Sequence, residues 1–298
     1  MPAPGRIAPG LRQRAEGLAA PLPPLLVAAE RVAATVAQGV HGRRRVGTGE
    51  TFWQFRRYQG GDPSTAVDWR QSAKRQSLFI RQNEWEAAES VWLWRDASPS
   101  MHYRSQLADT EKYERASLIL LALASLLIRG GERVALLGDG NLPTTGRATL
   151  DRLAVSLLLS GHAKGNQSLP PRADLPRFAQ IVVIGDFLSP TDEIVALVRA
   201  YAGSGVIGHL LQVRDPAEED MPFIGRTRFE GLEGEGSYLV GRADALREAY
   251  LGRVRRHHEA LVALCNSVGW TFSAHRTDRP AQTALLALYS SLSGGITW

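Results

Sequence analysis

Cysteine is almost absent from this chain of 298 residues, which contains only Cys265. A single cysteine excludes an internal disulfide and any metal site built from several thiolates. Cys265 lies in a helical pattern, which indicates packing rather than chemistry. With 44% hydrophobic and 22% charged residues, the composition is that of a soluble globular chain with one main core and a smaller appendage.

Long hydrophobic runs are also missing. The longest apolar stretch, residues 116–128, is too short and too interrupted to cross a bilayer. Residues 1–10 lack the hydrophobic region of a signal peptide. We therefore expect no transmembrane segment and a cytoplasmic location.

The usual signatures of nucleotide binding and of covalent catalysis are absent. No glycine-rich loop precedes a lysine, no G-x-G-x-x-G occurs, and no nucleophile stands paired with a base. The fragments Gly47-Thr48-Gly49-Glu50 and Gly60-Gly61-Asp62 are isolated. These absences favour a protein that is not an enzyme.

All the net positive charge lies in the first third of the chain. Residues 1–81 hold 13 Lys and Arg against 5 Asp and Glu, whereas the remainder holds 22 against 25. Such a region suits nucleic acid, anionic lipid or an acidic protein face. A solvated basic surface without a partner is the alternative. No known nucleic-acid-binding motif accompanies the basic residues.

Three regions follow from the change in pattern along the chain. Residues 1–23 are rich in Pro, Gly and Ala, and we expect a flexible N-terminus there. Residues 24–83 are expected to form an N-terminal helix, over residues 24–40, and a basic and aromatic lobe with a strand at residues 77–81. Residues 84–298 are expected to form the main α/β domain.

Strands and helices alternate through this main domain. We expect a doubly wound, mostly parallel sheet of the Rossmann-like kind, because alternation at this spacing places helices on both faces of a parallel sheet. The expected strands are residues 88–95, 133–137, 181–185, 206–213 and 270–274, with an antiparallel edge strand at 141–145 and a hairpin within 215–240. The expected helices are residues 113–129, 148–159, 191–202, 243–267 and 280–292.

Oxygen-bearing side chains follow the first of these strands. The apolar run Val91-Trp92-Leu93-Trp94 leads through Arg95 to Asp96, and Ser98 and Ser100 come next in the same turn. Carboxylate and hydroxyl oxygens suit hard cations such as Mg²⁺, Mn²⁺ or Ca²⁺. The alternative is that Asp96 and Ser98 only cap the turn and the following helix.

A second acidic residue, Asp186, follows the apolar strand at residues 181–185. The carboxyl ends of parallel strands meet at one edge of a sheet, and ligands bind there. We therefore expect Asp96 and Asp186 to flank a single ion. The alternative for Asp186 is an ordinary acid at the start of the next helix.

Two motifs in this sequence resemble known families. Asp96-Ala97-Ser98-Pro99-Ser100 is similar to the Asp-x-Ser-x-Ser metal-ion-dependent adhesion motif of von Willebrand factor type A domains. The preceding segments resemble the signature of the bacterial domain-of-unknown-function family 58, which runs directly into a type A-like domain. These segments are Phe52-Trp53-Gln54-Phe55-Arg56-Arg57-Tyr58, Gly60-Gly61-Asp62-Pro63, Val67-Asp68-Trp69-Arg70 and Ser72-Ala73-Lys74. The resemblance extends from about Gly39 to the C-terminus and includes Asp215-Pro216 and residues 275–280.

This resemblance implies a Mg²⁺-type site in which Asp96, Ser98 and Ser100 contribute oxygens and Asp186 acts at the edge, often through water. Type A domains add a threonine from another loop, for which Ser168, Thr144 and Thr145 are candidates here. Pro99 restricts the backbone within the motif, and Arg95 is a competitor for the Asp96 carboxylate.

The resemblance also implies a function. Type A domains with such a site bind proteins, and an acidic side chain of the partner completes the coordination of the ion. Members of the family often work beside MoxR-type AAA+ ATPases as adaptors. We therefore expect a non-catalytic protein-interaction module. The alternatives are a Mg²⁺-dependent phosphoester hydrolase, which two carboxylates and a metal suffice to build, and nucleic-acid binding through the basic lobe.

Overall fold

The computed structural model describes residues 22–39, 46–57, 72, 78–84, 90–162 and 167–294. The chain divides into two compact units, one of residues 40–89 and one of residues 1–39 together with 90–298. The flexible N-terminus expected at residues 1–23 lies almost wholly outside the described residues. No helix in the described ranges is long and apolar enough to cross a membrane.

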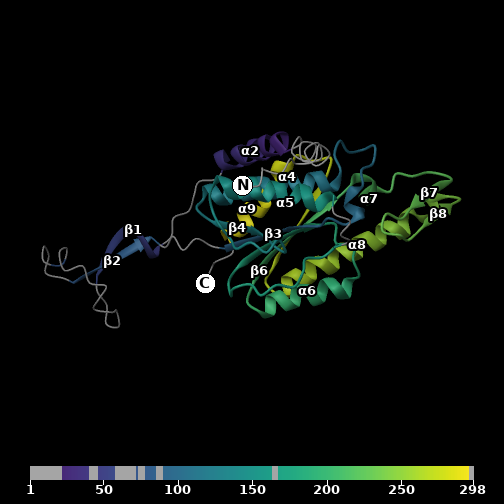
Figure 1. Ribbon diagram of the computed structural model, residues 1–298. Helices are drawn as coiled ribbons and strands as arrows, with labels where there is room; N and C mark the ends of the chain where they lie inside the picture. The colour runs from purple at the N-terminus through teal and green to yellow at the C-terminus, as the bar shows by residue number, and fades with distance from the viewer. Residues whose placement is uncertain are drawn as a thin grey trace, which may run out of the picture. The chain divides into compact units, whose positions relative to one another are not determined.

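The larger unit is built on a five-stranded sheet in which every neighbouring pair is parallel (Figure 1). The strand order is β4-β3-β5-β6-β9. The strands are β3 (Ser90–Arg95), β4 (Arg133–Leu136), β5 (Gln180–Gly185), β6 (Ile207–Arg214) and β9 (Thr271–Arg276). Every residue of β5 is buried, as expected for a central parallel strand covered on both faces.

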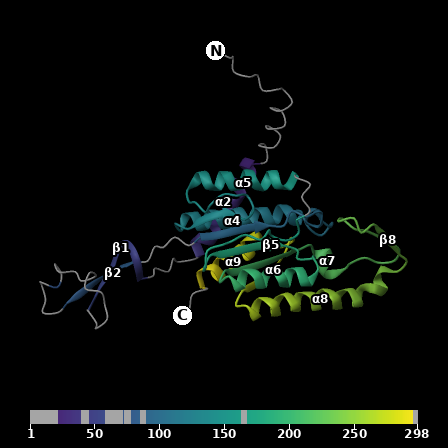
Figure 2. The same cartoon turned by 60° about the horizontal axis from the view of Figure 1, so that its bottom comes forward.

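Helices cover both faces of this sheet, so the predicted doubly wound α/β fold is confirmed. Helices α2, α4, α5 and α9 lie on one side, and α6 and α8 lie on the other (Figure 2). Their bounds are α2 (Leu22–Gly39), α4 (Lys112–Arg129), α5 (Arg147–His162), α6 (Thr191–Gly203), α8 (Ala243–Ser267) and α9 (Ala281–Gly294).

Helix α4 is buried nearly all round, with an unbroken buried run from Ile119 to Leu127. It lies between the sheet and the helices α2, α5 and α9, which explains why its sequence is apolar on every side. Its start is a capping box in which Glu111 and Glu114 satisfy each other's backbone amides. Contact with α4 and α9 also places α2 in the larger unit, whereas we expected this helix to belong with the lobe of residues 24–83.

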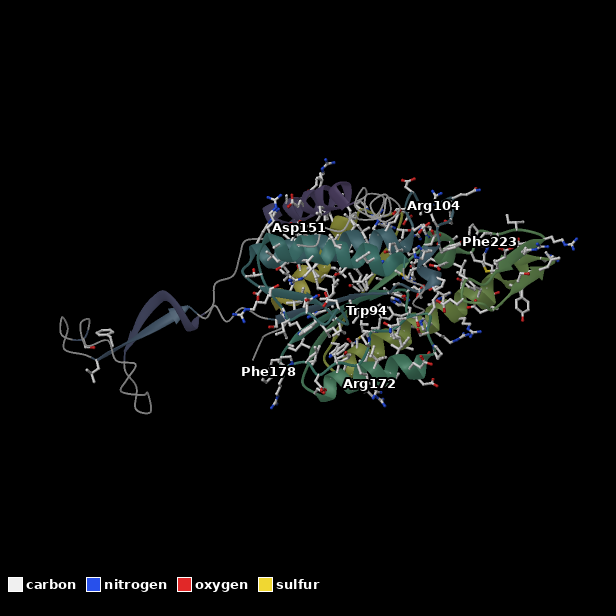
Figure 3. All side chains as sticks on the ribbon, viewed as in Figure 1. Trp94, Arg104, Asp151, Arg172, Phe178 and Phe223 are labelled. Carbon is white, nitrogen blue, oxygen red and sulfur yellow. The ribbon has the colours of Figure 1, made fainter. Side chains whose placement is uncertain are left out.

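The core on the opposite face of the sheet lies under α6 and α8. Trp94 of β3 is part of it, together with apolar residues of β5, β6 and both helices. Figure 3 shows Trp94 in the interior of the unit, whereas Arg104, Asp151 and Arg172 lie on its surface. Neighbouring residues of β3 point to opposite faces, so Arg95 faces α4. Its guanidinium lies 3.8 Å from the centre of the Tyr113 ring.

One predicted detail of the chain path differs from the structure, and two agree with it. The edge strand expected at residues 141–145 is reduced to a single antiparallel bridge between Val134 and Thr144. The hairpin expected within residues 215–240 is present as β7 (Thr227–Glu230) and β8 (Ser237–Val240), after the short helix α7 (Pro216–Asp220). Helix α8 has the predicted bounds.

Close packing of Trp270 on Gly208 of β6 leads to a stability prediction. The indole nitrogen of Trp270 donates to the Val206 carbonyl at 3.1 Å, and a methyl group at position 208 would overlap the ring. We expect Gly208→Ala to lower the free energy of unfolding by about 2 kcal/mol, measured by urea denaturation, because the core must shift to admit the methyl. Gly203→Ala is the control, because its methyl meets no atom within 4 Å. Equal stability of the two variants would contradict the prediction.

The smaller unit contains two antiparallel strands, β1 (Val46–Arg57) and β2 (Phe79–Glu84). Their register shifts near Phe52, which marks an irregular ladder. The hydroxyl of Ser72 accepts from the Phe79 amide at 2.8 Å, and both residues are buried. The strand expected at residues 77–81 is therefore β2, while the basic clusters at residues 43–45 and 74–75 lie outside the described residues.

Candidate metal site at the carboxyl ends of the strands

The structure brings together all four residues that the sequence suggested as metal ligands. Strands β3 and β5 are neighbours with Arg95 opposite Ile184, and the Asp96 amide extends the ladder by donating to the Ile184 carbonyl at 2.8 Å. Asp96 and Asp186 therefore follow adjacent strands at the same edge of the sheet. Gly185 permits this approach, because a side-chain carbon there would lie 2.9 Å from the Asp96 Cβ.

The turn after β3 directs the hydroxyl of Ser100 at Asp186. The Ser98 amide donates to Oδ1 of Asp96 at 2.8 Å, which closes the turn locally. Pro99 starts the short 3₁₀ helix η2 (Pro99–His102), where its fixed dihedral is compatible with a helical first position. The hydroxyl oxygens of Ser98 and Ser100 are 3.0 Å apart, and Ser100 donates to Oδ2 of Asp186 at 2.8 Å. The proline therefore does not displace Ser100 from the site.

Lys112, which we did not predict, is part of this cluster. Its fully buried ammonium donates to Oδ2 of Asp186 at 2.9 Å and to Oε1 of Glu218 at 2.5 Å. The charges of Asp186 and Glu218 raise the pKa of Lys112, although burial alone would lower it. The lysine is thus a permanent cation at neutral pH. The sequence carried one weak signal, since a lysine in the first turn of a helix opposes the helix dipole.

Residues at the carboxyl end of a third strand, β6, hold the cluster in place through hydrogen bonds. Asp215 follows β6 and caps α7, and its Oδ2 accepts from the Ser105 amide at 2.9 Å. Glu218 returns the contact by accepting from the Asp215 amide at 2.8 Å, which orients its carboxylate toward Lys112. Burial raises the pKa of Glu218, and Lys112 opposes that rise. Asp215 therefore positions the loop after η2 and the acid that holds Lys112.

Among the carboxylates of the site, Asp96 has a buried oxygen that accepts no hydrogen bond from the described residues. Its side chain is buried, and its Oδ2 has no hydrogen-bond partner within the described part of the chain. Burial first, and then the charge of Asp186, raises the pKa of Asp96 to about 7, while Ser98 and Lys112 act against the rise. An oxygen that is buried without a partner marks a place where a cation would be stabilising.

The donor set fits a hard cation. Asp96, Ser98 and Ser100 offer oxygens only, and the described residues contain no cluster of three or more His, Cys, Asp and Glu that would favour a softer metal or a carboxylate-rich cage. Asp186 already accepts from Ser100, Lys112 and the Leu188 amide. A cation bound here would therefore be ligated directly by Asp96 and the two hydroxyls, and Asp186 would contact it through water.

The other residues considered from the sequence have different positions. Arg95 lies over the Tyr113 ring and donates to the Leu157 carbonyl. Thr144 is bonded to Thr149 and Arg152 beside β4. The hydroxyl of Ser168 accepts from Ser189 at 2.8 Å, in the loop that follows Asp186. Ser168 is thus linked by a hydrogen bond to the loop that follows Asp186.

The fold and the site define a parallel α/β protein with a cluster of oxygen-bearing side chains at the carboxyl ends of two neighbouring strands. The chain belongs to the family described as protein of unknown function DUF58, whose model matches residues 54–260. The resemblance to this family noted in the sequence is thereby confirmed.

Solved structures similar to this chain include three bacterial proteins. The conserved hypothetical protein BatB from Bacteroides thetaiotaomicron is 17% identical, covering 70% of this chain and 100% of that one, with a TM-score of 0.40. An aerotolerance-related membrane protein from Bacteroides fragilis NCTC 9343, with multiple mutations to serines, is 18% identical with the same coverage and TM-score. An uncharacterized membrane spanning protein from Vibrio fischeri is 15% identical, covering 69% and 98%, with a TM-score of 0.18. Similarity at this level does not define a function, and no curated protein matches the chain.

Proposed function

We propose that this protein is a non-catalytic protein-interaction module with a metal-ion-dependent adhesion-type site. The observation that carries the proposal is the buried Oδ2 of Asp96, which has no hydrogen-bond partner among the described residues and lies beside the paired hydroxyls of Ser98 and Ser100. The resemblance of this motif to that of von Willebrand factor type A domains supports it. The ion would be Mg²⁺, or Mn²⁺ or Ca²⁺, held by Asp96, Ser98 and Ser100, with Asp186 at the edge.

The residues of the proposed site have different roles. Asp96 supplies the negative charge, and the two serines supply neutral oxygens. Lys112 compensates Asp186 and Glu218, so these acids do not add their full charge to the site. A bound ion would supply an open coordination position for one carboxylate of a partner protein. Limited negative charge around that position favours capture of an acidic group.

The partner class follows from the family resemblance. The resemblance implies that members of the family often work as adaptors beside MoxR-type AAA+ ATPases, and we propose that role here, with an acidic side chain of the partner directed at the site. Ser100 belongs to the lining of a surface groove, so this residue of the motif is within reach of a partner.

The test of the ion site is calorimetric titration of Mg²⁺ and Mn²⁺ at pH 8 into the wild-type protein, Asp96→Ala and Asp192→Ala. Asp192 is an exposed acid of α6 and serves as the matched control. We expect binding by the wild type and by Asp192→Ala, and at least roughly tenfold weaker binding by Asp96→Ala, because the only directly coordinating carboxylate is lost. Absence of heat, or heat unchanged in Asp96→Ala, would retire the site.

A second experiment separates an adaptor from a hydrolase. The tagged protein is incubated with a purified MoxR-type ATPase in Mg²⁺ and in chelator, and hydrolysis of para-nitrophenyl phosphate is measured in parallel. Metal-dependent capture that is lost in Asp96→Ala supports the adaptor. Metal-dependent phosphatase turnover lost in the same variant would replace the adaptor with a hydrolase.

A further inference from the structure

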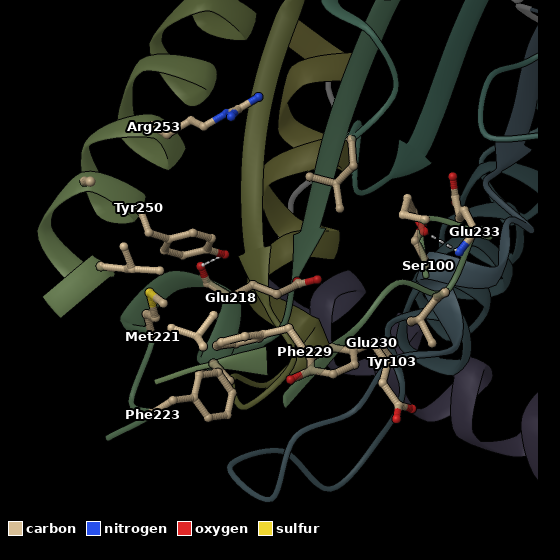
Figure 4. Close-up of a pocket in the computed structure, with 17 residues that line it drawn as sticks. Ser100, Tyr103, Glu218, Met221, Phe223, Phe229, Glu230, Glu233, Tyr250 and Arg253 are labelled. Carbon is tan, nitrogen blue, oxygen red and sulfur yellow. Dashed lines mark hydrogen bonds between the residues drawn. The ribbon is translucent and has the colours of Figure 1, made fainter. Parts of the chain in front are cut away.

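A groove of about 640 Å³ lies beside the candidate metal site, between the hairpin of β7 and β8 and the first half of α8. Figure 4 shows Met221, Phe223 and Phe229 along one wall and Tyr250 of α8 along another. The rings of Phe223 and Phe229 meet edge to face with centroids 5.3 Å apart. Ser100 belongs to the lining, so the groove and the ion site are neighbours.

The elements that form this groove extend away from the sheet and bury little. In α8 the buried residues are Ala243, Leu261, Leu264 and Cys265, so the helix buries no residue between positions 244 and 260. Figure 1 shows this half of α8 and the hairpin projecting together from the body of the larger unit. A two-stranded hairpin is only marginally stable by itself, so a partner surface would stabilise this projection.

Large apolar side chains remain exposed in the groove. Leu188, Leu232 and Leu246 line it and are 61%, 47% and 46% exposed. Each could therefore bury apolar area against a ligand. Scattered exposed leucines are ordinary, but several that line one concave surface indicate an interaction site. The size of the groove suits a few side chains of a peptide segment rather than a whole domain.

The charge of the lining selects the kind of segment. Four lining side chains are carboxylates, those of Glu218, Glu230, Glu233 and Glu235, and one is the guanidinium of Arg253. Glu218 is compensated by Lys112, which leaves the three acids of the hairpin region at the rim. Glu230, Glu233 and Glu235 are exposed, so they can pair with cations of a ligand.

We infer that this groove binds a segment of a partner protein in which apolar side chains are flanked by lysine or arginine. The apolar side chains would enter between Phe229 and Leu246, and the basic ones would meet the acids of the hairpin. This contact needs no ion, so it stands independently of the proposed adhesion site. A partner seated here would lie next to Ser100 and could engage both surfaces.

The test uses fluorescence anisotropy with two labelled 14-residue peptides, one of leucine and lysine and one of leucine and glutamate. Chelator is present throughout, so failure of the ion site leaves the result unchanged. We expect the leucine–lysine peptide to bind the wild-type protein more tightly than the leucine–glutamate peptide. Glu230→Lys combined with Glu233→Lys should reverse this preference.

Two leucines with the same exposure supply the matched pair for the apolar contact. Leu246 lies in the groove and Leu286 lies on α9, and both are 46% exposed. We expect Leu246→Asn to weaken binding of the leucine–lysine peptide roughly tenfold and Leu286→Asn to leave it unchanged, because only Leu246 would bury apolar surface against the peptide. Absence of binding, equal binding of both peptides, or equal effects of the two substitutions would overturn the inference.

Sedimentation velocity distinguishes a second copy of the chain from a separate partner. A concentration-dependent dimer that is lost in Leu246→Asn and kept in Leu286→Asn would assign the groove to self-association and overturn the inference. A monomer that binds the leucine–lysine peptide with the expected dependence on Leu246 supports it.

Discussion

Replacement of Lys112 by methionine is expected to lower the free energy of unfolding by about 3–5 kcal/mol, because it leaves the buried Asp186 and the partly buried Glu218 without their cation. The ammonium of Lys112 lies 2.9 Å from Asp186 and 2.5 Å from Glu218, and its side chain is fully buried. Methionine has a similar length and keeps most of the packing, so the loss reports mainly on charge. Urea denaturation at pH 7.5 measures the difference.

Arg129→Met is the control for this substitution, since Arg129 lies at the exposed end of the same helix. It removes one positive charge as well, and we expect a change within about 0.5 kcal/mol. A triple variant that combines Lys112→Met with Asp186→Asn and Glu218→Gln should recover part of the lost stability, because the uncompensated charges are removed. A loss in Lys112→Met no larger than that in Arg129→Met would show that the cluster is not a stabilising ion pair.

The second large effect is the dependence of stability on pH that Asp96 produces. Burial and the charge of Asp186 raise the pKa of Asp96 from its ordinary value of 3.8 to about 7 in the folded protein. Between these values the folded chain holds a proton that the unfolded chain has released. The stability contributed by the protonated carboxyl is therefore complete below pH 3.8 and is lost as the pH rises toward 7. Between pH 5 and pH 8 the loss is about 2.5 kcal/mol.

Asp96→Asn removes this titration while its side-chain oxygen can still accept from the Ser98 amide. We expect the difference in unfolding free energy between Asp96→Asn and the wild type to move by about 2.5 kcal/mol in favour of the variant from pH 5 to pH 8. The comparison with the wild type is needed because burial lowers the pKa of His209 and of His275 to about 4, and these residues give a dependence of opposite sign between pH 4 and 6.5. Urea titrations at both pH values test the prediction, and parallel pH profiles of the two proteins would contradict it.

Mg²⁺ links this pH dependence to the proposed function. If Asp96 holds the ion, added Mg²⁺ should stabilise the wild type at pH 8 more than at pH 5, since metal binding requires the ionised carboxylate. Asp96→Asn should gain little at either pH. Equal stabilisation of both proteins by Mg²⁺ would place the binding elsewhere.

The paired position of Asp96 and Asp186 could be predicted because it depends on a general property of the fold. Alternating apolar strands and helices indicated a parallel sheet, and in a parallel sheet the residues that follow neighbouring strands come to the same edge. The hydroxyls of Ser98 and Ser100 are local to Asp96, so their presence in the site required no knowledge of distant contacts.

Lys112 and Glu218 could not be predicted as members of the site. Lys112 is separated by 74 residues from Asp186 and by 106 from Glu218. Whether these residues meet depends on where α4 begins and how α7 is oriented by Asp215, and a pattern of apolar residues does not fix either. The position of α2 against α4 could not be predicted either. The apolar face of α2 shows that the helix packs against another element, but it does not show which one.

The sequence by itself determined the class of fold, the order of its elements and the oxygen-bearing turn after β3, because periodicity and local spacing govern these features. Only the tertiary structure decided that a buried lysine compensates the charge of Asp186 and that one oxygen of Asp96 has no partner among the described residues. It also decided that a groove lined by apolar side chains and glutamates includes Ser100. The physical reason is that burial and long-range charge pairing arise from packing between distant segments. The sequence of any one segment carries no record of the neighbours that it acquires.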